Sequence, residues 1–138
     1  MEKSRKIIIL FCTIVLIICG IKWSVGLENQ LDIFFGDEAE YMRNGLNLFK
    51  TVAKDWGPTY NLWYKFLSIF DANPISLYYL NYKIGVILIG VLLFIFLIRY
   101  HINIIISFWL SFCFLFTSTL IDTWPRVSHF VVIILLFT

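Results

Sequence analysis

Long apolar runs separated by short polar breaks dominate this sequence. Three runs, at about 7–23, 76–98 and 102–121, have roughly the 17–25 residues that a helix needs to cross a bilayer. A fourth run begins at 129 and extends for about 10 residues, or about 15 Å of helix, before Thr138. A half-span would leave its last carbonyl groups unsatisfied in hydrocarbon. The pattern therefore predicts an all-α integral membrane protein, a helical bundle, of which residues 1–138 are a truncated, N-terminal part of a single transmembrane domain.

Composition agrees with a membrane protein. Hydrophobic residues make up 60% of the 138 residues and charged residues 14%, against roughly 45–50% and 25% in soluble domains. The formal net charge is only +2, and the basic residues are scattered. The basic stripe that binds nucleic acid is missing, so we exclude nucleic acid as a partner.

The cysteines show neither a disulfide framework nor a metal-ligand spacing. All three, Cys12, Cys19 and Cys113, lie inside apolar runs. Cys12 and Cys19 would be about 10 Å apart along one helix, which is too far for a disulfide. We interpret the cysteines as small packing residues.

The first span has a basic leader, "MEKSRK", and small residues at 24–26 where a signal peptidase could cut. Further apolar runs embed the chain in any case, so an uncleaved signal anchor is the better interpretation. The positive-inside rule places the N-terminus and Arg99 in the cytoplasm. The segment 24–75 then lies outside, and it holds seven of the nine acidic residues. Tyr78, Tyr79 and Tyr82 are placed where an aromatic belt would meet the interface.

Two amphipathic helices are predicted in this first outer loop. Apolar residues recur every three or four positions over about 38–54 and again over about 59–70. The sequence "WGP" separates the two segments, since Gly57 suits a helix C-terminus and Pro58 a helix start. Both helices are too polar to span, so we expect them to lie in the membrane interface beside the bundle.

Three carboxylates open the first of these helices, in "GDEAEYM". Asp37 is a good N-cap, Glu40 suits a capping box and Glu38 complements the helix dipole, so helix capping accounts for all of them. Their position at the membrane surface, on the same side as Asp122, favours chemistry as well. A carboxylate at a helix N-terminus stays ionised, which suits a metal ligand or a transition-state stabiliser better than a strong base.

The order of basic leader, span, "GDEAEYMRNGLNLF", "WGPTYNLWYKFL" and two further spans resembles the N-terminal part of GT-C superfamily membrane glycosyltransferases. It is most similar to bacterial relatives of protein O-mannosyltransferases and lipid A aminoarabinose transferases. In that family an Asp-Glu pair in the first extracytoplasmic loop, followed by Ala and an aromatic residue, opens a juxtamembrane helix at the active site. The matching residues here are Asp37 and Glu38, followed by Ala39 and Tyr41. The chain departs from the family in length, because the later spans are missing.

The resemblance implies transfer of a sugar from a polyprenyl-phosphate carrier to an acceptor hydroxyl on the outer face of a bacterial inner membrane. The catalytic residues would be Asp37, Glu38 and Asp122, with Asp37 as base or metal-linked carboxylate. Arg126, His129 and Tyr41 would bind substrate. Any divalent metal would be held by Asp37 or Asp122, and the partners would be the lipid-linked donor and membrane lipids.

Structural interpretations stand beside these roles. Arg126 is also explained as a snorkelling anchor, His129 as a structural histidine and Asp122 as a loop residue. A non-catalytic membrane scaffold is the main alternative function. A lipid-carrier transporter would need ionisable residues within the spans, whereas Lys22 and Lys83 are predicted at span ends.

Overall fold

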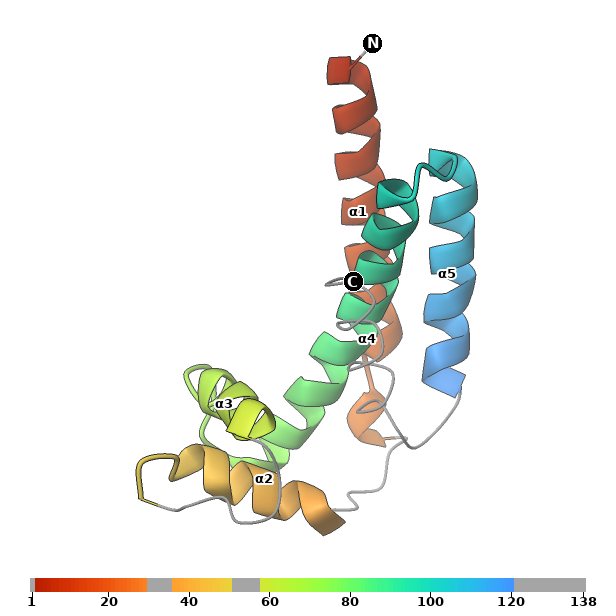
Figure 1. Ribbon diagram of the computed structural model, residues 1–138. Coiled ribbons are helices and arrows are strands. Elements are labelled where there is room, and N and C mark those ends of the chain that lie inside the picture. The colour runs from red at the N-terminus through yellow and green to blue at the C-terminus, as the bar shows by residue number, and fades with distance from the viewer. Residues whose placement is uncertain (1, 30–35, 51–57, 121–138) are drawn as a thin grey trace. The chain divides into compact units, whose positions relative to one another are not determined.

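The computed structural model describes residues 2–29, 36–50 and 58–120, and all regular structure within these ranges is helical, without a strand. Figure 1 shows α1 (Glu2–Ser24), a short 3-10 turn η1 (Leu27–Asn29), α2 (Gly36–Leu46), α3 (Pro58–Leu67), α4 (Pro74–Arg99) and α5 (Ile104–Leu120). The all-α prediction is confirmed for these residues. The predicted start of a fourth span, 129–138, lies outside them.

The chain divides into two compact units. One comprises Met1–Val25 and Lys83–Thr138, and the other is Gly26–Tyr82. Helix α4 contributes its first turns to the second unit and the remainder to the first. At 26 residues it is about 39 Å long, more than the roughly 30 Å of a hydrocarbon core. Lys83 marks the place where its aromatic first turns give way to an uninterrupted apolar run.

In the first unit, α1 and α4 are long and apolar enough to cross a membrane. Only 17% of the apolar window of α1 and 33% of that of α4 is buried, whereas the core helix of a soluble protein is mostly buried. Helix α5, the predicted third span, is also apolar but has 17 residues, at the lower limit for crossing.

Small residues bring the helices of this unit together. A Cβ on Gly20 of α1 would lie 3.0 Å from Ile87 Cγ1 of α4, so the two helices approach closely there. The side chain of Leu115 in α5 packs against Gly90 of α4. Close approach at small residues is the usual way in which helices pack in lipid, where burial of apolar surface gives no driving force.

The connection between α4 and α5 is a short loop, as predicted. The N–H of Ile102 donates to Leu97 O and that of His101 to Ile98 O, both at 3.1 Å, which is the bonding pattern of a Schellman motif. His101 is the left-handed residue of the motif, with φ 61°. Asn103 then caps α5, since its Oδ1 accepts from Ile105 N at 2.9 Å. His101 thus has a structural place in the turn.

In the second unit, α3 leads into α4 through the six residues 68–73. The Asp71 carboxylate accepts from Asn73 N at 2.9 Å, and Asn73 Oδ1 accepts from Ile75 N at 2.9 Å. The Asn73 N–H, followed by the Ser76 hydroxyl, lowers the pKa of the exposed Asp71 carboxyl. Asn73 is therefore the N-cap of α4, with Pro74 in the first position of the helix.

Helix α2 differs from the predicted 38–54 at both ends. It begins at Gly36, and residues 47–50 form turns. Asn44, Gly45 and Asn47 are poor helix formers. In addition, Asn47 Nδ2 donates to Arg43 O at 3.0 Å, which competes with continuation of the helix. The apolar periodicity continues past Leu46, but residues 47–50 are not α-helical, and the predicted residues 51–54 lie outside those described.

Candidate functional site

Helices α2 and α3 pack against each other at Gly45. A Cβ added there would lie 2.7 Å from both the backbone oxygen of Asn61 and Tyr64 Cβ. No side chain fits at such distances, so glycine allows the two helix backbones to touch. Tyr41 and Met42, on the same face of α2, are buried. The apolar stripe of α2 is thus covered by α3 (Figure 1).

Tyrosine rings continue this contact along α3. Tyr41 meets Tyr60 edge-on with ring centroids 4.9 Å apart, and Tyr60 meets Tyr64 in the same way at 5.3 Å. Edge-to-face pairs of this kind contribute about 0.5–1.5 kcal/mol each beyond the buried area. Tyr41, predicted to bind substrate, therefore has a ring that is packed inside the unit.

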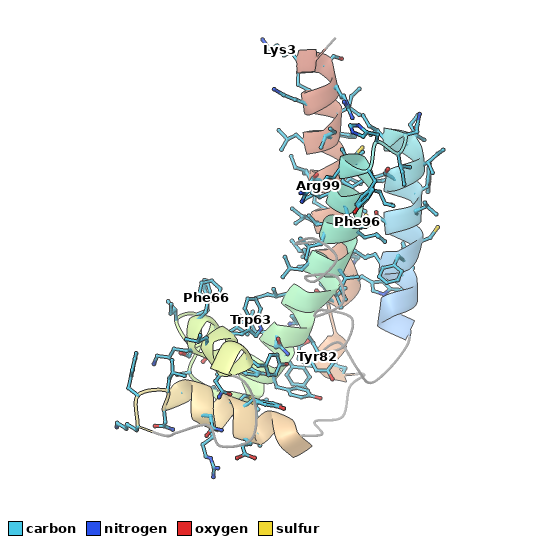
Figure 2. The ribbon with its side chains drawn as sticks, viewed as in Figure 1. Lys3, Trp63, Phe66, Tyr82, Phe96 and Arg99 are labelled. Atoms are coloured by element: carbon cyan, nitrogen blue, oxygen red, sulfur yellow. The ribbon has the colours of Figure 1, made fainter. Side chains whose placement is uncertain are left out.

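Asn81 joins α3 to the first turns of α4. Its Oδ1 accepts from Trp63 Nε1 at 2.7 Å, and its Nδ2 donates to the Tyr60 hydroxyl at 3.2 Å. Asn81 is 2% exposed, so these bonds are shielded from water. Figure 2 shows Trp63 and its neighbours between α3 and α4.

Tyr78 and Tyr79 are buried as well. The two rings meet edge-on at 5.6 Å, and Tyr78 also lies 5.0 Å from the ring of Tyr82. Tyr78 and Tyr79 therefore have their rings inside the protein, and the aromatic belt predicted for them and Tyr82 stays a prediction. Their amphipathic rings are buried within the protein, which sequence pattern alone does not distinguish from a membrane interface.

A second buried amide has an unmet hydrogen-bonding group. Asn61 is 1% exposed, and within the described residues its Oδ1 has no hydrogen-bond partner. Leaving a buried acceptor unsatisfied costs about 1–3 kcal/mol. Asn61 lies opposite Gly45, so this cost falls at the closest approach of α2 to α3.

The three predicted carboxylates occupy two different places on α2. Asp37 and Glu38 lie in the first turn of the helix. Glu40 is exposed, and its Oε1 is 3.8 Å from Arg43 Nη2. An exposed pair of this kind contributes little. The side chains of Asp37 and Glu38 are outside those that the structure describes.

The other predicted site residues have not been tested. Asp122, Arg126 and His129 lie outside the described residues, as does any contact they make with α2. Within the described part of the chain, no three metal-ligating side chains come together. The assignment of a metal to Asp37 or Asp122 therefore stays a prediction.

Sequence reasoning missed the two residues that hold this unit together. Gly45 falls within the apolar periodicity of about 38–54, and Asn81 lies in "YYLNYK" near the start of the second predicted span. Each carried a signal. Gly45 is a helix-disfavouring residue within a helical pattern, which indicates close packing, and Asn81 is an amide within an aromatic run.

Replacing Asn81 by Leu should lower the stability of this unit by about 1–2 kcal/mol, because Trp63 Nε1 loses its acceptor in a part-buried place. Near-UV circular dichroism of the purified protein during unfolding measures the loss, since it reports on packed Tyr and Trp rings. Trp63→Phe removes the donor, so the double variant should be more stable than the sum of the two single losses predicts. Strict additivity would contradict the role of this hydrogen bond.

Comparison with known proteins gives no match. No family model matches the chain, and no curated protein or solved structure does so. Function is therefore inferred from the residues of α2, α3 and α4 and from the sequence pattern around them.

Proposed function

We propose that this chain is an integral membrane protein that forms the N-terminal portion of a polytopic glycosyltransferase. The reaction is transfer of a sugar from a polyprenyl-phosphate carrier to an acceptor on the extracytoplasmic face. One observation supports it most strongly: α2 starts at Gly36, so Asp37 and Glu38 stand in its first turn, and α3 holds this helix by close packing at Gly45. Helix capping alone does not require such support.

The surface of α1 supports the membrane part of the proposal. Large apolar side chains are exposed along the whole helix: Ile7, Ile8, Leu10, Phe11, Ile14, Ile18 and Ile21. Exposed apolar surface of this extent is typical of a membrane or protein interface. With the basic leader in the cytoplasm, the second unit lies on the extracytoplasmic side.

In the proposed mechanism, Asp37 accepts or orients the proton of the attacking hydroxyl. The first turn of α2 keeps this carboxylate ionised, because the N-terminal end of a helix carries a partial positive charge. Arg126 neutralises the phosphate that leaves, assisted by His129, and Asp122 and Glu38 support the reacting groups. Inversion follows if the hydroxyl attacks opposite the departing phosphate.

The contacts around Tyr41, Tyr60 and Asn81 have a positioning role in this mechanism. These ring contacts and buried hydrogen bonds hold α2 against α3. A catalytic group must be held within a fraction of an ångström, which rigid supporting contacts provide. The rigidity of α2 is thus the contribution of the described residues to catalysis.

A non-catalytic scaffold is the second candidate. The apolar side chains that α5 exposes, such as Trp109 and Leu110, favour it, because a partner helix would cover them. This function predicts a stable complex and no turnover.

The direct test uses the complete natural gene product, purified and reconstituted in vesicles with polyprenyl-phosphate-linked sugars. We expect release of polyprenyl phosphate together with a glycosylated acceptor. Failure to turn over any member of a panel of lipid-linked sugars and envelope acceptors, by a protein shown to be folded and inserted, would favour the scaffold.

A further inference from the structure

The two helices of the outer loop present different surfaces. We propose that α3, and not α2, docks on the lipid bilayer, and that α2 is stacked on α3 as a second layer without lipid contact. The proposal depends on α1 and α4 being embedded in the membrane but not on sugar transfer.

Helix α3 is apolar on two sides. The inner side, with Asn61, Tyr64 and Leu67, is at most 1% exposed. The outer side begins with Leu62 and Phe66, which are 52% and 49% exposed. The turns after the helix extend it with Ile69 and Phe70, at 76% and 68%. We call Leu62, Phe66, Ile69 and Phe70 the outer patch.

Ring contacts order the outer patch before any partner binds. Phe66 stacks on Trp63 with centroids 5.8 Å apart and meets Phe70 edge-on at 5.7 Å. Trp63 is in turn fixed by its hydrogen bond to Asn81. Figure 2 shows Phe66 on the side of α3 away from α2. A preformed surface loses little side-chain freedom on docking.

Among its described side chains, helix α2 presents no comparable surface. Its apolar residues Tyr41 and Met42 are buried and Gly45 is in contact with α3, while its exposed face carries the charged Glu40 and Arg43. In this part of the chain the exposed large apolar side chain is Phe49, which belongs to the turns after the helix. We therefore infer that Tyr41, Met42 and Gly45 of α2 are turned to α3 and not to lipid, which differs from the interfacial position that the sequence predicts for this helix.

The occupant of the outer patch is inferred from its position in the chain. Residues 71–73 separate it from α4, and α4 exposes Ile75 in its first turn before it continues as an apolar helix that can span. Apolar surface thus continues from the outer patch into the start of a spanning helix. An aromatic and aliphatic helix face at the end of a span is typical of an interfacial helix at the headgroup boundary. The bilayer surface fits this patch.

Packed helix axes lie about 8–10 Å apart. Because α2 is stacked on the side of α3 opposite the outer patch, its axis should lie that much further from the lipid. The start of α2, with Asp37 and Glu38, would then be held above the bilayer surface, within reach of water-soluble groups.

Spin labels on single cysteines test the layering. In a background with Cys12, Cys19 and Cys113 replaced by Ser, labels are placed at Phe66→Cys and Ile69→Cys on α3 and at Glu40→Cys and Arg43→Cys on α2. The protein is reconstituted in vesicles of phosphatidylcholine and phosphatidylglycerol. We expect the α3 labels to lose accessibility to a water-soluble nickel chelate and to gain accessibility to oxygen, and the α2 labels to remain open to the chelate.

Each other outcome contradicts the proposal. Chelate access at all four positions would show that α3 does not dock, and oxygen access at Glu40→Cys and Arg43→Cys would show that α2 does. Protection of α3 that disappears when the protein is diluted in lipid would assign the patch to a second copy of the chain. Ile69 follows the helix and is mostly exposed. A label at Ile69→Cys therefore still measures the accessibility of the outer patch if Phe66→Cys disturbs the ring contacts. Far-UV circular dichroism checks that each labelled protein is folded.

Discussion

Replacing Asp37 by Asn and Glu38 by Gln is expected to abolish sugar transfer by the full-length protein, which should still insert and accumulate. General acid–base catalysis contributes about 10²- to 10⁴-fold in rate. The structural cost is far smaller, because the charge of a carboxylate in the first turn stabilises a helix by about 0.3–1 kcal/mol. Turnover of a lipid-linked sugar by the wild-type and variant proteins, at matched amounts in the membrane, measures the difference.

Glu40→Gln is the matched control for this experiment. Glu40 belongs to the same acidic cluster but lies on the exposed face of α2 near Arg43, where its ion pair is worth about 0.5 kcal/mol or less. We expect this variant to keep normal transfer. Normal transfer by the Asp37→Asn and Glu38→Gln protein, or an equal loss in Glu40→Gln, would refute the catalytic assignment.

Gly45→Val is expected to separate α2 from α3. A Cβ at this position would be 2.7 Å from the Asn61 backbone oxygen and from Tyr64 Cβ, and a backbone atom does not move aside as the end of a side chain does. Overpacking costs about 1–3 kcal/mol and occasionally more. Gly45→Ala should lose about 2 kcal/mol, since the better helix propensity of Ala offsets about 1 kcal/mol of the clash.

Hydrogen exchange of the α2 amides measures this effect locally. A loss of about 3 kcal/mol in Gly45→Val corresponds to exchange about a hundredfold faster. Asn44→Ala is the control: it raises helix propensity at the neighbouring position, and slower or unchanged exchange is expected. If Gly45→Val kept the protection of the wild-type protein, the close approach of α2 and α3 would not occur in solution.

The helices were predictable because their signals are local. Apolar runs of sufficient length produced the expectations for α1, α4 and α5, and the structure places these helices within a few residues of the predicted spans. The end of α3 was predicted less well, because about 59–70 was expected from the apolar pattern and the helix stops at Leu67. The length of α2 was overestimated because the apolar pattern continues where Asn47 turns the backbone.

The candidate site was predictable only in part. The acidic cluster is evident in the sequence, but the same three residues satisfy a capping box, so residue type alone could not separate Asp37 and Glu38 from Glu40. The start of α2 at Gly36 places Asp37 and Glu38 in its first turn, and the exposed pair that Glu40 forms with Arg43 sets that residue apart. Asn81 stands out as an amide within an aromatic run, but its role could not be predicted, because its partners Trp63 and Tyr60 lie 18 and 21 positions away in the chain.

The sequence by itself determined which segments are helical and apolar, since helix formation and hydrophobic periodicity depend on neighbours within one or two turns. Only the tertiary structure decided what covers each apolar face. The stripe of α2 and the outer patch of α3 are alike in sequence. Gly45 lets α3 cover the stripe of α2, while Leu62 and Phe66 stay exposed. That difference depends on contact between distant segments, which no local pattern records.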